Sequence, residues 1–124
     1  MTDVDFKPAG WPHVVPRIVV SDTKGLVTFL HEVFDATGEH QTQRPSEIWI
    51  GDSVILIGEP GVRPRLAAFL YVYVDDTDAT YWRALTAGAR SLESPTDQPY
   101  GDRRCMVEDP WGNTWQIATR LKRP

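Results

Sequence analysis

The sequence predicts an α+β fold made of two copies of one β-α-β-β-β unit. The first observation is an internal repeat: aligning Asp22 with Asp76, and Gly51 with Gly112, superimposes an apolar run, a helical stretch and further short strands. Repetition of one supersecondary unit constrains architecture more than any single propensity does. The second observation is the length of the chain, because 124 residues suit one domain with a hydrophobic core. We expect a single domain over residues 1–124, with module one at about 12–58, a linker at about 58–66 and module two at about 67–120.

The first module begins with the apolar run Val14 to Val20, which predicts a strand. Asp22 stands where a helix N-cap belongs, and Gly38 is a suitable stop for the helical stretch that follows. Gly51 and Asp52 then form a tight turn between two short strands. The helix is expected to bury a one-sided stripe of Leu26, Phe29, Leu30, Val33 and Phe34.

The second module repeats this plan with its own turn residues. Phe69 to Val74 predicts a strand, Asp76 or Thr77 caps a helix, and Gly88 ends it. Asp109 to Gly112 suits a type I turn, with Asp first, Pro second and Gly fourth. The helix side chains expected to face the sheet are Tyr81 and Leu85, with Trp82 as a further candidate.

Composition excludes several classes of protein. A net charge of −4 with scattered Lys and Arg argues against nucleic acid as a partner. No segment approaches the ~20 apolar residues that span a bilayer, and the first ten residues lack a signal peptide's apolar core. One cysteine, Cys105, excludes an intrachain disulfide and is expected to be a buried thiol. We therefore expect a cytoplasmic protein without membrane partners.

Two stretches, Tyr71 to Asp76 and Pro99 to Thr119, resemble the glyoxalase/bleomycin-resistance/dioxygenase family of the vicinal oxygen chelate superfamily. The Pro-Tyr-Gly-Asp-Arg element and the Asp-Pro-x-Gly-Asn-x-Trp turn are the most specific features. The resemblance implies two modules whose sheets curl round an open cleft, and a homodimer with two clefts. It does not imply one activity, because a fold hosts many functions. We expect Asp102 and Arg103 to lock the Tyr100-Gly101 loop through an ion pair.

Enzymes of this superfamily hold a divalent metal with one residue from the first and last strand of each module, generally His, Glu or Gln. The corresponding residues here are Val15, Ile55, Phe69 and Gln116. A Zn, Fe or Mn site needs about three or more N, O or S ligands, so we expect no metal and no other cofactor. A register slip of two residues would add only His13. Two further histidines are not expected to belong to this ligand set: His31, on the polar side of the first helix, and His40, on an expected short strand.

Period-two alternation divides the strand residues between a cleft face and a helix face. Arg17 is notable on the cleft side, because a charge in an apolar strand needs a partner, which would be Glu47, Glu59 or a ligand. The helix face is expected to hold Ile18, Val20, Val54, Leu56, Leu70, Val72, Val74, Trp115 and Ile117. The candidate ligand-binding residues are His13, Val15, Arg17, Trp49, Ile55, Ile57, Phe69, Tyr71, Tyr73, Thr114 and Gln116.

Two functional classes follow from these features and from the resemblance. The favoured one is a metal-free protein that binds and sequesters a drug or natural product, similar to bleomycin-resistance proteins, with antibiotic binding and resistance as its implied role. The alternative is an enzyme of the lyase or dioxygenase type, either metal-dependent or using Arg17, His13 or a tyrosine as acid or base. No residue is assigned a catalytic role, and the sequence leans away from an enzyme.

Overall fold

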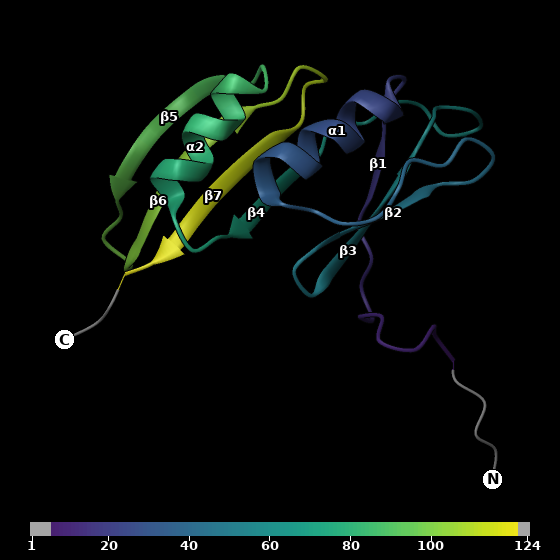
Figure 1. Ribbon diagram of the computed structural model, residues 1–124, viewed down its shortest axis with the longest axis horizontal. Coiled ribbons are helices and arrows are strands. Elements are labelled where there is room, and N and C mark those ends of the chain that lie inside the picture. Colours follow the sequence, from purple (N-terminus) through teal and green to yellow (C-terminus); the bar gives the residue numbers. More distant parts are fainter. Residues whose placement is uncertain (1–5, 122–124) are drawn as a thin grey trace, which may run out of the picture.

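A computed structural model describes residues 6–121 and confirms the α+β fold of two modules. Each module places one helix on one side of a small sheet, and both helices lie on the same side of the molecule (Figure 1). The first module contains β1 (Arg17–Val19), α1 (Thr23–Phe34), β2 (Ser46–Ile50) and β3 (Ser53–Gly58). The second contains β4 (Phe69–Tyr73), α2 (Thr77–Thr86), β5 (Arg90–Asp97), β6 (Asp102–Glu108) and β7 (Thr114–Arg120).

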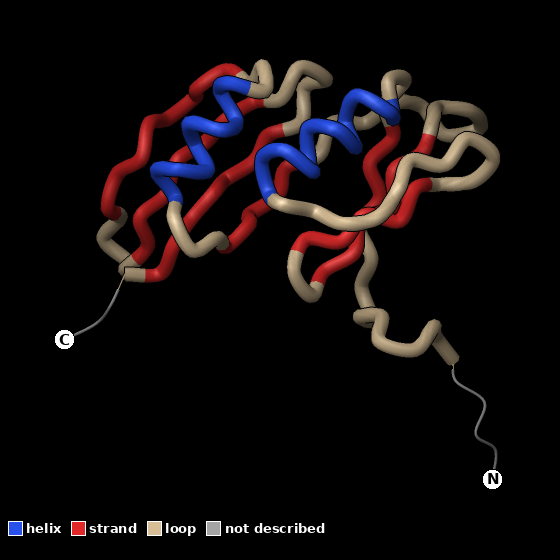
Figure 2. Tube along the Cα trace, viewed as in Figure 1, coloured by secondary structure: helices blue, strands red, loops and turns tan. Residues whose placement is uncertain are grey.

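The two sheets have related strand orders, β1-β3-β2 and β4-β7-β6-β5, and they remain separate (Figure 2). In each sheet the first strand of the module lies parallel to the last. The first module has one strand fewer than predicted, because no strand forms around His40 in the described chain. Its side chain instead contacts Thr23, with Nε2 2.9 Å from Oγ1, and Thr37 forms only an isolated bridge with Trp49.

The first strand is also shorter than the apolar run predicted. It begins at Arg17, because Pro12 and Pro16 lack the N–H groups that a strand ladder needs. Both helix caps follow the prediction: Asp22 accepts the Gly25 N–H at 3.0 Å, and Asp76 accepts the Ala79 N–H at 3.0 Å. Helix α1 stops earlier than expected, since Asp35 takes up the left-handed conformation with φ 55°. The predicted stripe on α1 is buried.

Register in the second sheet agrees with the alternation in the sequence. Trp115 and Ile117 of β7 are fully buried on the helix side, where they align with Val107 and Cys105 of β6. The free thiol of Cys105 is buried, as expected. One helix prediction was wrong: Tyr81 is buried, but Trp82 is 63% exposed on α2. The short side chains of Thr80 and Ala84 fill the contact with the sheet instead.

Register in the first sheet differs from the prediction by one residue on β3. Ile57 aligns with Ile18 and Ile55 aligns with Ile48, and all four are buried in the main core. Ile55 and Ile57 therefore face α1, whereas the sequence predicted that they face the cleft. Val54 and Leu56, predicted on the helix side, lie on the opposite face. The reason is that β3 is apolar at consecutive positions, so alternation does not distinguish its faces.

The two modules contact each other through their helices and turns. At the start of α1, the Trp111 indole N–H lies 3.2 Å from Asp22 Oδ2. At its end, Arg83 of α2 donates to the Val33 carbonyl at 3.2 Å. The Phe34 ring packs 5.2 Å from that of Trp115. These contacts join the helix side of the molecule, and neither helix of the described chain is long and apolar enough to cross a bilayer.

Candidate functional site

The side of the second sheet that faces away from α2 bears a row of aromatic residues. Phe69, Tyr71 and Tyr73 alternate along β4 and are 67%, 39% and 62% exposed. Tyr71 aligns with Gln116 of β7, and Tyr73 aligns with Ala118. The four strands of this sheet therefore present side chains, most of them polar or aromatic, on one surface, which we call the open face. It consists of Phe69, Tyr71, Tyr73, Glu93, Arg104, Met106, Thr114, Gln116 and Ala118.

A chain of hydrogen bonds joins the polar groups of this face. Tyr71 and Tyr73 both donate to Oδ2 of Asp102, at 2.5 Å and 2.8 Å. The Tyr71 hydroxyl also lies 3.3 Å from that of Tyr100. Arg104 donates to the Tyr100 hydroxyl at 3.2 Å and to Glu93 at 2.7 Å. The rings of Tyr71 and Tyr73, 5.3 Å apart, are thus held by a nearly buried carboxylate.

These contacts keep the tyrosines protonated. Burial, and then the hydrogen bond to Asp102, hold the pKa of Tyr71 well above its usual range. The hydrogen bond to Asp102 is the main cause of the raised pKa of Tyr73. Burial opposes the charge on Arg104, but Glu93 and Tyr100 outweigh it and raise its pKa. Near neutral pH the open face therefore carries two neutral phenols and a guanidinium.

Arg104, Glu93, Tyr100 and Asp102 were not among the predicted site residues. Asp102 and Arg103 do not form the predicted ion pair, because neighbours on a strand point to opposite faces. Arg103 pairs with Asp78 at 2.8 Å and Asp97 at 2.9 Å. The same alternation, counted from Cys105, which the sequence predicts to be buried, was the signal that could have placed Arg104 on the opposite, open face.

Asp109 of the family-like turn has a structural role. It is nearly buried, and its carboxylate accepts the backbone N–H groups of Trp111 and Asn113, both at 2.9 Å. It also accepts the Asn113 amide at 3.0 Å and the Trp115 indole at 2.9 Å. Because all these donors belong to the turn and β7, Asp109 fixes the start of the strand that bears Gln116. As predicted, Asp109 belongs to a turn, whereas its neighbour Glu108 is the last residue of β6.

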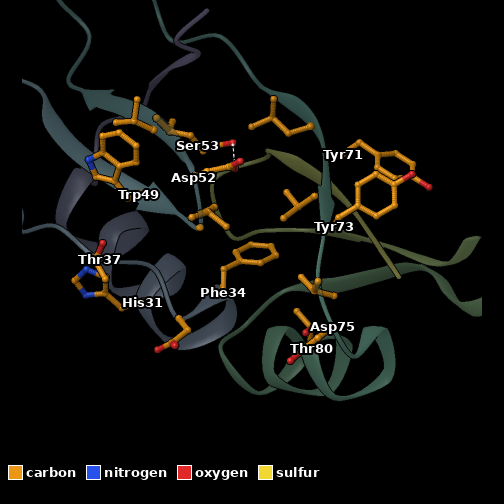
Figure 3. Close-up of a pocket in the computed structure, with 18 of the residues that line it drawn as sticks. His31, Phe34, Thr37, Trp49, Asp52, Ser53, Tyr71, Tyr73, Asp75 and Thr80 are labelled. Atoms are coloured by element: carbon orange, nitrogen blue, oxygen red, sulfur yellow. Dashed lines mark hydrogen bonds between the residues drawn. The ribbon is translucent and has the colours of Figure 1, made fainter. Parts of the chain in front are cut away.

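A crevice of about 1080 Å³ lies between the modules, where β4 approaches the β2-β3 turn. Four of the predicted site residues line it: Trp49, Ile55, Tyr71 and Tyr73. Figure 3 shows the rings of Tyr71 and Tyr73 pointing away from Phe34, so these tyrosines stand where the crevice meets the open face. The crevice wall mixes apolar and polar side chains, and its carboxylates are Glu32, Asp35, Asp52 and Asp75.

The remaining predicted residues lie apart from one another. Phe69, Thr114 and Gln116 share the open face. His13 and Val15 belong to the segment before β1, where the His13 ring lies 5.6 Å from Phe6. Arg17 is exposed and makes no hydrogen bond or ion pair within residues 6–121, so it does not pair with Glu47 or Glu59. Ile57 is buried against α1.

The donor set does not fit the metal of the superfamily's enzymes. Of the corresponding residues, only Gln116 offers a ligand atom, whereas Val15, Ile55 and Phe69 offer only hydrocarbon. Ile55 also lies on the helix side of its sheet. In the part of the chain that the structure describes, no group of three or more His, Cys, Asp or Glu side chains converges.

Comparisons with known proteins agree with this architecture. The sequence profile of the Glyoxalase/Bleomycin resistance protein/Dioxygenase superfamily matches residues 10–117. An uncharacterized protein of Mycobacterium tuberculosis H37Rv is 27% identical, across 90% of this chain and 76% of its own length.

Two solved structures show the same fold. TioX from Micromonospora sp. ML1 superimposes with a TM-score of 0.74 at 22% identity, covering 89% of this chain and 99% of its own. A glyoxalase/bleomycin resistance protein/dioxygenase family enzyme from Burkholderia phytofirmans gives 0.74 at 19% identity, covering 86% and 97%. The profile match, spanning most of the chain, shows that this protein belongs to the glyoxalase/bleomycin resistance protein/dioxygenase superfamily.

Proposed function

We propose that this protein binds and sequesters an amphipathic small molecule, such as a drug or natural product, without a metal. The observation that carries the proposal is the exposed aromatic row of Phe69, Tyr71 and Tyr73 on a sheet face that no helix covers. A contiguous exposed apolar patch is typical of a binding surface. Covering an aromatic side chain contributes about 1.5–3 kcal/mol, so this row supplies affinity while the neighbouring polar groups orient the ligand.

The protonation of the face favours binding over acid–base catalysis. Tyr71 and Tyr73 have raised pKa values, so near neutral pH they act as hydrogen-bonding groups rather than bases. Burial raises the pKa of the Cys105 thiol to about 11, and its side chain lies on the helix side of the sheet. A thiol in that state is a poor nucleophile. The two tyrosines therefore support a ligand contact, and neither they nor Cys105 favour a reaction.

We propose further that two copies associate, with the first sheet of one copy facing the open face of the other. Both sheets leave the side opposite their helix without helix cover (Figure 1). Arg17, exposed and unpaired within residues 6–121, lies on that side of the first sheet with Leu56 and Glu47. A partner copy would complete a two-walled site and bring Arg17 to it. A cytoplasmic location fits the single buried cysteine.

The test compares two exposed aromatic residues on opposite sides of the molecule. Equilibrium dialysis against a panel of planar antibiotics would identify a ligand, with elemental analysis for metal and light scattering for mass. Phe69→Ala should weaken binding about tenfold, because it removes part of the aromatic row. Trp82→Ala, on α2, is the matched control and should leave affinity unchanged. Equal effects of the two variants, or binding that appears only with added metal, would contradict the proposal.

A further inference from the structure

The hydrogen bonds of the open face have a fixed direction. A guanidinium can only donate and a carboxylate can only accept, so the two ends of the chain, Arg104 and Asp102, set its polarity. Tyr71 and Tyr73 each have one hydroxyl hydrogen, and both hydrogens go to Asp102, at 2.5 Å and 2.8 Å. In the 3.3 Å contact between Tyr71 and Tyr100, the hydrogen must therefore come from Tyr100.

The direction of these hydrogen bonds determines which further hydrogen bonds the tyrosine hydroxyl groups can form. Tyr73 has given its only hydrogen to Asp102, and its oxygen keeps a lone pair for a ligand even with the Tyr71 hydroxyl beside it. Tyr71 accepts one, from Tyr100. Both hydroxyls have unused lone pairs and no hydrogen to offer a ligand. With the Asp102 carboxylate behind them, these oxygens repel an incoming carbonyl or carboxylate oxygen and attract an N–H or O–H group.

Within residues 6–121, Arg104 and Arg120 do not reverse this preference. Arg104 already donates to Glu93 at 2.7 Å and to Tyr100 at 3.2 Å. Its Nε, which has no hydrogen-bond partner in the described chain, is enclosed and out of reach of a ligand. Arg120 influences Tyr73 only weakly and is exposed, so solvent screens its charge.

From this geometry we infer that the site selects ligands whose apolar or aromatic body bears a hydroxyl or amino group that donates to Tyr73 and Tyr71. Molecules of the same shape that present only acceptor oxygens at that end are disfavoured. The inference rests on the proposed binding function, and it assigns the ligand a chemical class. Asp102 has a positioning role here, because it acts through the two tyrosines by taking their hydrogens.

The test uses two uncharged probes, naphthalenemethanol and its methyl ether, in which a methyl group replaces the donor hydrogen. Equilibrium dialysis against the full chain should give a dissociation constant about fivefold or more lower for the alcohol, since one hydrogen bond is lost in the ether. Naphthylmethylamine should follow the alcohol. If the ether binds as tightly as the alcohol, the inference is wrong but the binding function stands. If none of the three binds, the binding function itself is contradicted.

A pair of Tyr→Phe variants locates the preference. Tyr73→Phe removes the acceptor oxygen and keeps the ring, so the alcohol should lose its advantage while the ether binds as before. Tyr81→Phe is the matched control, because its hydroxyl donates to Ser91 at 2.8 Å on the helix side of the sheet. This control should keep the full preference for the alcohol. A Tyr73→Phe protein that still prefers the alcohol by the same factor would overturn the assignment.

Discussion

The two modules share one plan but differ in how their uncovered faces are organised. In the second sheet, β4 and the first four residues of β7 alternate between residues on the helix side and the aromatic or polar groups of the open face. In the first sheet, β3 is apolar on both faces, and the charged residue beside it, Arg17, has no partner in residues 6–121. One supersecondary unit therefore supports a preorganised polar network in one copy, and in the other a face on which Arg17 and Glu47 flank Leu56 without forming an ion pair.

The turns before the last strands differ in the same way. In the second module, Asp109 is nearly buried and accepts four hydrogen bonds from Trp111, Asn113 and Trp115. In the first module, the Gly51-Asp52 turn is exposed, and within residues 6–121 the Asp52 carboxylate accepts only from the Ser53 hydroxyl, at 3.2 Å. The turn of the second module is therefore held by more hydrogen bonds than the turn of the first. Three measurements test this difference between the modules.

The largest effect is expected at the two turn aspartates. Asp109→Ala leaves the Asn113 amide and the Trp115 indole without acceptors in a buried site, so we expect a loss of about 3–5 kcal/mol in the free energy of unfolding. Asp52→Ala, at the corresponding exposed turn, should change it by less than about 0.5 kcal/mol. Urea denaturation measures both. Similar losses in the two variants would show that the turns contribute equally.

The next effect tests the register of β3 with neighbouring residues. Ile57→Ala opens a cavity against Ile18 and α1 and should cost about 2–4 kcal/mol. Leu56→Ala, on the partly exposed opposite face, should cost about 1 kcal/mol. Urea denaturation measures the loss in the free energy of unfolding for each variant. A larger loss for Leu56→Ala than for Ile57→Ala would show that Leu56 faces α1, as the alternation in the sequence predicts.

The smallest effect concerns pH and applies to the second module alone. Tyr71 and Tyr73 have a higher pKa in the folded protein than when unfolded, so their contribution to stability is complete below about pH 10, the unfolded value. It declines as pH rises above that value, because the unfolded chain then loses protons that the folded chain keeps. The urea midpoint should therefore fall less between pH 8 and pH 11 for the Tyr71→Phe, Tyr73→Phe double variant than for the natural sequence. Equal declines would mean that Asp102 does not bind these hydroxyls.

Much of the second module could be predicted from the sequence because its signals are local. Alternation along Phe69 to Tyr73 placed the aromatic row, since polar and apolar residues differ between the two faces of β7. Asp76 and the Asp109 to Gly112 turn fixed where the helix and the last strand begin. The fold itself followed from the repeat of the two units.

Other features depended on contacts between residues far apart in the sequence. The sequence alone determined the two-module α+β architecture, both helix caps and the absence of a metal-ligand set at Val15, Ile55, Phe69 and Gln116. Only the tertiary structure decided that Ile55 and Ile57 face the helix, because β3 is apolar at consecutive positions and its face depends on which side α1 packs. It alone brought Asp102 to Tyr71 and Tyr73, since residues about thirty positions apart meet only when β4, β7 and β6 align.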